Sequence, residues 1–290
     1  MYRIAILGCE NSHADAFLDL IINQKKYPDI EVVGVYSNES EALDRMKANF
    51  GVYCAASYDE FVGKVDGIMI TARDGRNHYK YAAPYIASGI PMFIDKPITS
   101  DEDEALAFMR ELKSHGCKVT GGSSCPHAPY VKELAAKVAA TSPEDIYGGY
   151  LRAPVSMQNN YGNFFFYAQH LAEVLQSIFG YYPKSVLAHK NANVITLTVK
   201  YDSYDVSAEY VDGNYVYYAS VSTKDGIVGD AYTIDGSLYY HELDAFDALL
   251  HGAAQPCSYR QLIAPVYLIC AIARAIESGE EESLAEIGEI

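Results

Sequence analysis

The chain has 290 residues, of which 50% are hydrophobic and 21% are charged, as in globular proteins large enough for two domains. Lysine and arginine (22 residues) are outnumbered by aspartate and glutamate (38), and the formal net charge of −16 argues against nucleic acid or an anionic membrane as partner. We find no signal peptide, no apolar run near the ~20 residues that span a bilayer, and no C-x-x-C pair, so we expect a cytoplasmic protein with reduced thiols and no metal site.

Strand and helix patterns alternate through the first 122 residues. Apolar runs predict strands, and periodic apolar spacing with capping residues predicts the helices between them. This order is typical of a parallel sheet covered on both faces, so we predict a Rossmann-type α/β domain at 1–122. The predicted strands are 4–7, 30–36, 52–53, 66–71, 91–95 and 117–120, and the predicted helices are 14–23, 39–50, 58–62, 76–88 and 101–115.

The turn after the first strand has the position of a dinucleotide phosphate site. Gly8 ends the strand, and Asn11 and Ser12 lead into a helix whose free N–H groups and positive dipole end suit a pyrophosphate. The fingerprint G-x-G-x-x-G is incomplete, because Glu10 stands at the second glycine and His13 at the third. Glu10 brings bulk and negative charge to the place where phosphate would approach.

The second strand ends in Ser37 and Asn38, where a dinucleotide fold usually carries an acid for the adenine ribose. Both residues are neutral. That leaves three alternatives open: NADP, a weakly held NAD, or no nucleotide.

The segment Asp95-Lys96-Pro97 follows a buried apolar run, so Lys96 is held at the carboxyl end of a strand, where open α/β sheets keep their ligands. Pro97 can neither donate to a ladder nor continue a helix. A lysine on such a stiff mount can be a proton donor or a substrate clamp. The alternative is a solvated lysine beside a turn proline.

A second domain is predicted for residues 123–290. Its apolar and alternating runs predict an antiparallel sheet, with hairpin turns at 212–214 and 224–226, and a long closing helix at 259–277 that packs back on the first domain. Many of the 26 tyrosines lie in these strands, which favours a subunit interface over a sugar-stacking platform. We take the acidic stretch 279–282 as a solvated end.

Asp95-Lys96-Pro97-Ile98 resembles the Glu-Lys-Pro-(Ile/Leu) signature of the glucose-fructose oxidoreductase, inositol dehydrogenase and MocA family. Gly8, Thr71, His78 and the lead-in 89–93 match other landmarks of that family. The resemblance implies a Rossmann domain that binds NAD or NADP, followed by an α+β domain whose large, mostly antiparallel open sheet forms an oligomer interface. It also implies a sugar, cyclitol or polyol as substrate.

The resemblance assigns roles to residues. Lys96 would bond the substrate hydroxyl, and Asp95, Thr71 and His78 would lie at the cofactor together with the phosphate turn and Ser37-Asn38. In the family, a helix with the pattern Asp-x-Gly-x-His-x-x-(Asp/Glu) faces the nicotinamide, and His170 fits its histidine.

Two departures from the family pattern concern the substrate side. Phe166 stands where the family has its catalytic aspartate, and Tyr167 is a candidate for supplying a hydroxyl in its place. His170 is either the proton-transfer partner, since its ordinary pKa suits proton exchange near neutral pH, or a core histidine. An arginine of the family is missing after residue 122, so that Ser124 or His127 would have to substitute.

The sequence therefore predicts an NAD(P)-dependent oxidoreductase that transfers hydride to or from a sugar- or polyol-like substrate, with Lys96, His170 and Tyr167 at the reacting centre. We expect a homodimer or homotetramer formed through the second sheet. The alternative is a non-catalytic sugar- or nucleotide-binding protein of the same fold, which three departures favour: Glu10 in the phosphate turn, the neutral Ser37-Asn38, and Phe166 in place of the catalytic acid.

Overall fold

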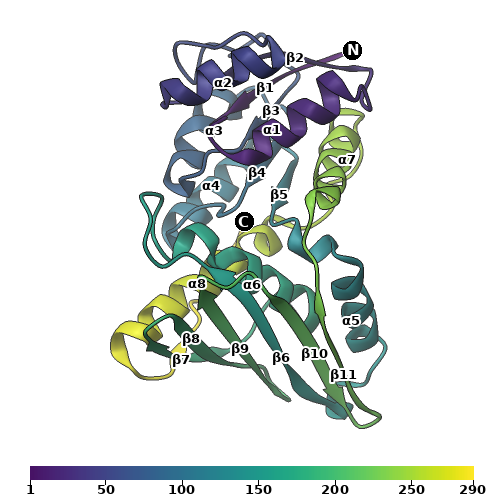
Figure 1. Ribbon diagram of the computed structural model, residues 1–290, viewed down its shortest axis with the longest axis vertical. Helices are drawn as coiled ribbons and strands as arrows, with labels where there is room; N and C mark the ends of the chain where they lie inside the picture. The colour runs from purple at the N-terminus through teal and green to yellow at the C-terminus, as the bar shows by residue number, and fades with distance from the viewer.

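The computed structural model describes all 290 residues and has two sheets, one in each half of the chain (Figure 1). The first is a five-stranded parallel sheet in the order β2-β1-β3-β4-β5, in which the order reverses between β1 and β3. Its strands are β1 (Tyr2–Leu7), β2 (Ile30–Tyr36), β3 (Gly67–Ile70), β4 (Met92–Asp95) and β5 (Val119–Gly122), and its helices are α1 (Ser12–Leu18), α2 (Ser40–Phe50), α3 (His78–Ile86) and α4 (Glu102–Ser114).

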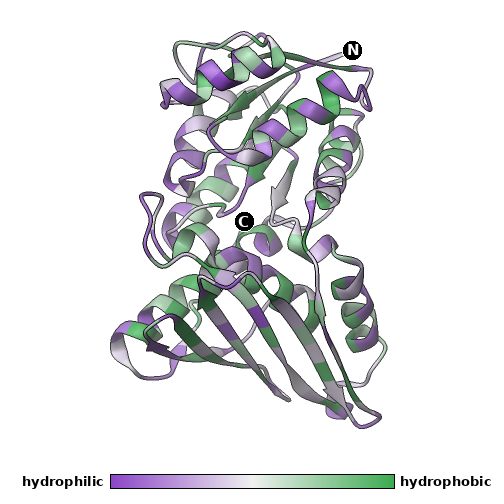
Figure 2. Cartoon of the chain, viewed as in Figure 1, coloured by the Kyte–Doolittle hydropathy of each residue, from purple (hydrophilic) through white to green (hydrophobic).

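Alternate side chains of the parallel strands enter two different cores. Ile4 and Ile6 of β1 pack with α1, α2 and the later helix α7 (Tyr239–Leu250), whereas Ala5 and Leu7 pack with α3, α4 and α8 (Tyr259–Ser278). Both faces are covered, so these strands are apolar almost throughout, and they appear mainly green in Figure 2.

Parts of the first domain differ from the sequence prediction. Val52 and Tyr53 form no strand of their own, because the chain there makes only an isolated bridge between Val35 and Cys54 beside β2. The predicted helix at 58–62 is a series of turns. The predicted helix 14–23 begins earlier, at Ser12, and its last part is a π-helix (Asp19–Asn23).

The second sheet has seven strands in the order β11-β10-β6-β9-β8-β7-β12, antiparallel except for the pair β6 and β9. The predicted class, a Rossmann-type sheet plus a large and mostly antiparallel one, is confirmed. The strands are β6 (Ile146–Val155), β7 (Ser185–Asn191), β8 (Val194–Lys200), β9 (Asp205–Asp212), β10 (Tyr217–Thr223), β11 (Gly226–Tyr232) and β12 (Glu282–Ser283).

Three turn and strand predictions in this domain have clear outcomes. The hairpin at 224–226 is confirmed, since Thr223 pairs with Gly226. The hairpin at 212–214 is wrong, because β6 lies between β9 and β10 and the connection crosses it. The acidic end is not wholly solvated, because Glu282 pairs with Val186 and Glu281 accepts a hydrogen bond from Ser185.

Helices α5 (Pro129–Ala139), α6 (Phe165–Phe179) and α8 cover one face of the second sheet, and the other face stays open (Figure 1). The first half of α8 packs in the core of the parallel sheet and its second half in the core of the second sheet, so that this helix joins the domains. By length and mean hydropathy (1.4) α8 could cross a bilayer, but 67% of that stretch is buried inside this fold.

Candidate active site between the two domains

The loops that follow β1, β3, β4 and β5 meet at the carboxyl edge of the parallel sheet, where open α/β sheets bind ligands. The turn after β1 begins at Gly8, whose φ is +87°. A Cβ at Gly8 would lie 2.3 Å from the backbone of Ala72, in the loop after β3. Only glycine therefore permits this close approach of the two loops.

The Glu10 carboxylate points toward the carboxyl ends of the neighbouring strands β2 and β3. Its Oε2 accepts a hydrogen bond from the Ser37 hydroxyl (2.7 Å), and its Oε1 accepts one from the Arg73 backbone N–H (3.0 Å). Arg73 and Arg45 in turn donate to the Glu10 carbonyl. The side chain is 3% exposed, so Glu10 binds the ends of β1, β2 and β3 together. The N–H groups of Asn11 and of the first residues of α1 are left without protein acceptors.

Asp95, at the end of β4, is buried and contacts the side chains of Asn11 and His13 in the turn after β1. Its Oδ2 accepts from the Asn11 amide (3.0 Å) and lies 2.7 Å from the Nδ1 atom of His13, and its Oδ1 accepts from the backbone N–H of Lys96 (2.7 Å). Burial alone would raise the pKa of Asp95, but the charges and hydrogen bonds of His13, Lys96 and His78 hold it below its usual value. Asp95 thus fixes the backbone that carries Lys96. The Lys96–Pro97 peptide bond is cis.

A cavity of about 370 Å³ lies between this edge and the second domain. Both Lys96 and His170 line it, as the enzyme prediction requires, because that prediction needs the two side chains to converge on one pocket. Aromatic side chains form much of the remaining wall. The lining residues are Asn11, Ser12, His13, Arg73, Lys96, Ser124, Tyr161, Phe166, Tyr167, His170, Tyr217, Ile234 and Tyr239.

The Lys96 ammonium faces aromatic rings. Its Nζ lies 4.8 Å from the centre of the Phe166 ring and 5.3 Å from that of Tyr167. Burial lowers the pKa of Lys96, and the charge of Asp95 opposes this only in part. A carboxylate at position 166 would raise the lysine's pKa, so the aromatic residue here keeps Lys96 readier to release its proton.

His170, on α6, is held by the residues that follow β5. Its Nδ1 lies 2.6 Å from the Ser123 hydroxyl and 3.3 Å from the Cys125 thiol. The Ser123 oxygen also accepts from the Cys125 backbone N–H. Burial, and then the positive charge of Lys96, lowers the pKa of His170 well below its ordinary value. The ring is therefore neutral, and if Ser123 donates to Nδ1 the ring proton is on Nε2.

Other residues that the sequence singled out lie away from the cavity. Thr71 is buried and donates to the Gly8 carbonyl (3.0 Å), and His78 is buried with its Nε2 2.8 Å from the Ala72 carbonyl. Both stabilise the loops after β1 and β3 from the side away from the cavity. Asn38 is exposed next to Ser37.

Of the two candidates for replacing the family's arginine, Ser124 lines this cavity and His127 lines a different one. Arg73 is a basic residue that the sequence analysis overlooked. It donates to the Tyr161 hydroxyl (2.8 Å) at the rim of the cavity. Arg73 follows β3, and the order of the sheet reverses between β1 and β3. Since ligands bind at such a point, its position in the sequence could have marked Arg73 as a candidate site residue. Tyr217 and Tyr239 could not have been recognised as site residues from the sequence, because the chain has 26 tyrosines and many lie in strands and helices.

The model of the oxidoreductase family with an NAD-binding Rossmann fold, named after glucose-fructose oxidoreductase, inositol dehydrogenase and MocA, matches residues 2–123. No protein of curated function matches the chain.

Similar solved structures share the fold over nearly the whole chain at low sequence identity. GenD2 from gentamicin A biosynthesis, in complex with NAD, has a TM-score of 0.84 and 13% identity, covering 98% of this chain and 97% of that one. Myo-inositol 2-dehydrogenase from Lactobacillus plantarum has a TM-score of 0.84 and 13% identity, with 98% and 99% covered. The WlbA dehydrogenase from Bordetella pertussis, with NADH and UDP-GlcNAcA, has a TM-score of 0.82 and 15% identity, with 98% and 99% covered. Residues 2–123 thus match the NAD-binding Rossmann fold of the oxidoreductase family named after glucose-fructose oxidoreductase, inositol dehydrogenase and MocA, and the whole chain shares the fold of these solved structures.

Proposed function

We propose that this protein is an NAD-dependent oxidoreductase that interconverts an alcohol and a carbonyl group on a sugar-, cyclitol- or polyol-like substrate. The observation that carries the proposal is the convergence of Lys96 and His170 on one cavity at the carboxyl edge of the parallel sheet. When bound, the nicotinamide supplies or accepts the hydride.

Lys96 is the proposed proton donor and acceptor at the substrate oxygen. Its lowered pKa lets the neutral amine accept the hydroxyl proton during oxidation and the ammonium return it during reduction. The backbone of Lys96 is fixed between Asp95 and Pro97, so the amine is already positioned before the reaction. This reduces the entropy lost on reaching the transition state.

His170 and Tyr167 are proposed to orient the substrate. A neutral His170 with Nδ1 occupied by Ser123 can donate from Nε2 to a substrate oxygen. Burial also raises the pKa of Tyr167, so its hydroxyl keeps its proton and serves as a donor. These fixed donors and the amine suit a substrate rich in hydroxyl groups, and the aromatic walls suit the apolar face of a sugar ring.

The residues at the phosphate turn fit the cofactor. The unpaired N–H groups after Glu10 are placed to bind a pyrophosphate, and Gly8 keeps the turn tight. The carboxylate of Glu10, beside Ser37 at the end of β2, lies where Rossmann folds place the acid that bonds the adenine ribose. That negative charge would repel a 2′-phosphate, and Arg45 is engaged by Asp15 and backbone carbonyls. We therefore propose NAD rather than NADP.

The proposal is tested by titrating the purified protein with NADH and with NADPH, read by calorimetry. We expect saturable NADH binding and at least about tenfold weaker NADPH binding, in keeping with one repelled charge. Replacing Glu10 by glutamine should narrow this preference. If neither nucleotide bound at millimolar concentration, the oxidoreductase proposal would fail and the non-catalytic binding protein would be the better explanation.

A substitution at Phe166 tests the role of the aromatic wall. In Phe166→Asp the new carboxylate should raise the pKa of Lys96, and the midpoint of the rising limb of the pH–rate profile for alcohol oxidation should move up by about 1–3 pH units. The matched variant Phe166→Asn has the same size without the charge. If the midpoint of the pH–rate profile moved equally in the two variants, the packing at position 166, and not its charge, would set the pKa of Lys96.

We also propose that the open face of the second sheet is an interface between copies of the chain. It carries the facing pairs Tyr150–Tyr218 and Arg152–Glu209, and Leu187 is 43% exposed there. Aromatic residues and arginine are enriched at interfaces. Sedimentation equilibrium should give a dimer or tetramer, and Tyr218→Glu should shift it toward monomer; a monomeric wild type would refute the interface.

A further inference from the structure

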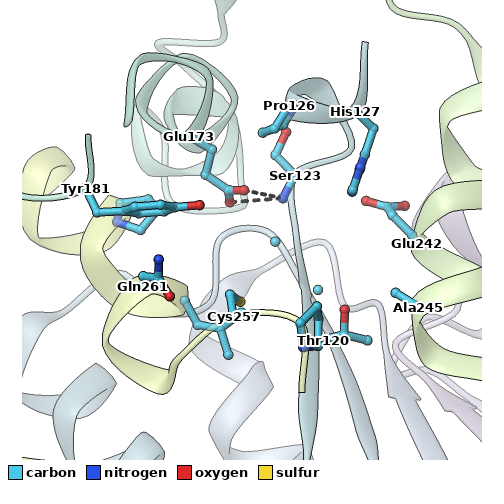
Figure 3. Close-up of a pocket in the computed structure, with 15 residues that line it drawn as sticks. Thr120, Ser123, Pro126, His127, Glu173, Tyr181, Glu242, Ala245, Cys257 and Gln261 are labelled. Atoms are coloured by element: carbon cyan, nitrogen blue, oxygen red, sulfur yellow. Dashed lines mark hydrogen bonds between the residues drawn. The ribbon is translucent and has the colours of Figure 1, made fainter. Parts of the chain in front are cut away.

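A second cavity, of about 190 Å³, lies on the other side of β5 from the catalytic cavity and shares no lining residue with it. It is enclosed by the end of β5, α6, α7 and the start of α8. Figure 3 shows Glu173 and Glu242 reaching into it from different walls, with Tyr181 and Gln261 on the side of Glu173 and away from Glu242. None of the residues proposed above to act on the substrate lines this cavity.

Glu242 has no partner in the fold. It is 4% exposed, and both oxygens of its carboxyl group lack a hydrogen bond. Glu173, by contrast, accepts from the backbone N–H of Ser123 at 2.9 and 3.0 Å. A buried carboxyl group without a partner is costly to keep, so its presence at the wall of a cavity points to a ligand that satisfies it.

The lining contains no compensating positive charge. None of its 15 residues is lysine or arginine, and burial lowers the pKa of its one histidine, His127, to about 4, so that the ring is neutral. Lys96 lines the catalytic cavity and not this one, and its positive charge lowers the pKa of Glu242 only in part. Burial raises the pKa of Glu173 to about 8 and that of Glu242 well above its usual value, and a cation beside them would lower both pKa values.

The arrangement does not suit a bare metal ion. The cluster of three ligating side chains with converging atoms in this fold is Asp29, Asp247 and His251, on the surface. Carboxyl groups on separate walls are better bridged by a cation of several atoms. At roughly 30 Å³ per water in the liquid, the cavity has room for about six waters or a small organic molecule.

We propose that this second cavity binds a small organic ammonium ion, whose N–H groups donate to Glu242 and Glu173. The aromatic ring of Tyr181 lines the same space and adds a surface that favours a cation. Ser123 links the site to the catalytic residues, because its N–H donates to Glu173 and its hydroxyl lies 2.6 Å from His170. Gln169 is a second link, since it donates to Glu173 and accepts from the backbone N–H of Ile98, which follows the Lys96–Pro97 segment.

The experiment is a calorimetric titration of the full chain with ethanolamine hydrochloride, with ethylene glycol as a neutral probe of the same number of non-hydrogen atoms and with magnesium chloride at matched ionic strength. We expect saturable binding of ethanolamine only. Glu242→Gln keeps the shape and removes the charge, and should weaken binding roughly 10- to 100-fold. Glu133→Gln, an exposed acid on α5, should leave it unchanged.

Three results would overturn the proposal. Equal binding of ethanolamine and ethylene glycol would mean that the cavity does not select charge, and binding of magnesium alone would mean that it is a metal site. Equal affinity of Glu242→Gln and Glu133→Gln for ethanolamine would place the binding elsewhere. The wild-type comparison of the three probes decides the first two questions without any variant. None of these outcomes depends on whether the protein turns over a sugar.

Discussion

Replacing Lys96 by methionine is expected to reduce kcat for alcohol oxidation by roughly 10²- to 10⁴-fold, the contribution usual for a positioned proton-transfer group. Methionine keeps most of the apolar stem and removes the amine, so the cavity should keep its shape. Because burial disfavours the ammonium, its loss should leave the protein at least as stable as before. The measurement is NADH formation over a panel of cyclitols, aldoses and linear polyols, with the Tm of each variant.

Two further variants separate proton transfer from charge. Lys96→Arg retains a cation that cannot lose its proton, so its activity should stay close to that of Lys96→Met if the proton is what matters. A largely active Lys96→Arg would instead make residue 96 an electrostatic clamp. Lys132→Ala, an exposed lysine on α5, is the matched control and should have wild-type activity. Unchanged turnover in Lys96→Met would remove the lysine from the mechanism altogether.

The second large effect is expected from Gly8→Ala, which should destabilise the protein by roughly 2–6 kcal/mol, the sum of left-handed backbone strain and overpacking. The φ of +87° disfavours any side chain, and the new Cβ would lie 2.3 Å from the Ala72 backbone, which is not free to move aside. Since domains are stable by only about 5–15 kcal/mol, the variant should be marginally folded. Urea denaturation followed by circular dichroism measures the loss.

Gly51→Ala provides the comparison. Gly51 ends α2 with φ +66°, but a Cβ there would meet nothing within 4 Å. Only the backbone strain applies, so the loss should be about 1–2 kcal/mol. If both variants lost the same free energy, the close contact between the two loops would not be what fixes glycine at position 8.

Much of the fold follows from local pattern, because apolar periodicity and capping residues depend on near neighbours in the chain. The strand at Ile30–Tyr36 and the long helix from Tyr259 are examples, since both are continuously apolar or regularly spaced. No apolar or alternating pattern marks the strand β11, because its seven residues include Gly226 and Gly229 and are mostly exposed. Only the hairpin turn at 224–226 indicated a strand there. The prediction of a hairpin at 212–214 was wrong because a glycine turn shows where the chain reverses but not which strand lies next to it in the sheet.

At the site, the sequence alone determined that Gly8 and Lys96 stand at strand ends and that a histidine stands on a later helix, α6. The positions of Gly8 and Lys96 follow from where each strand must stop, which is a local property of the sequence. Only the tertiary structure decided what each residue does. It turned Glu10 toward Ser37, put Phe166 beside Lys96, and made the ring of His170 neutral through burial. It also placed Glu173 and Glu242, 69 residues apart (242 − 173), on the walls of one cavity. Burial, charge and pairing arise when distant segments meet, so the pattern of the sequence cannot contain them.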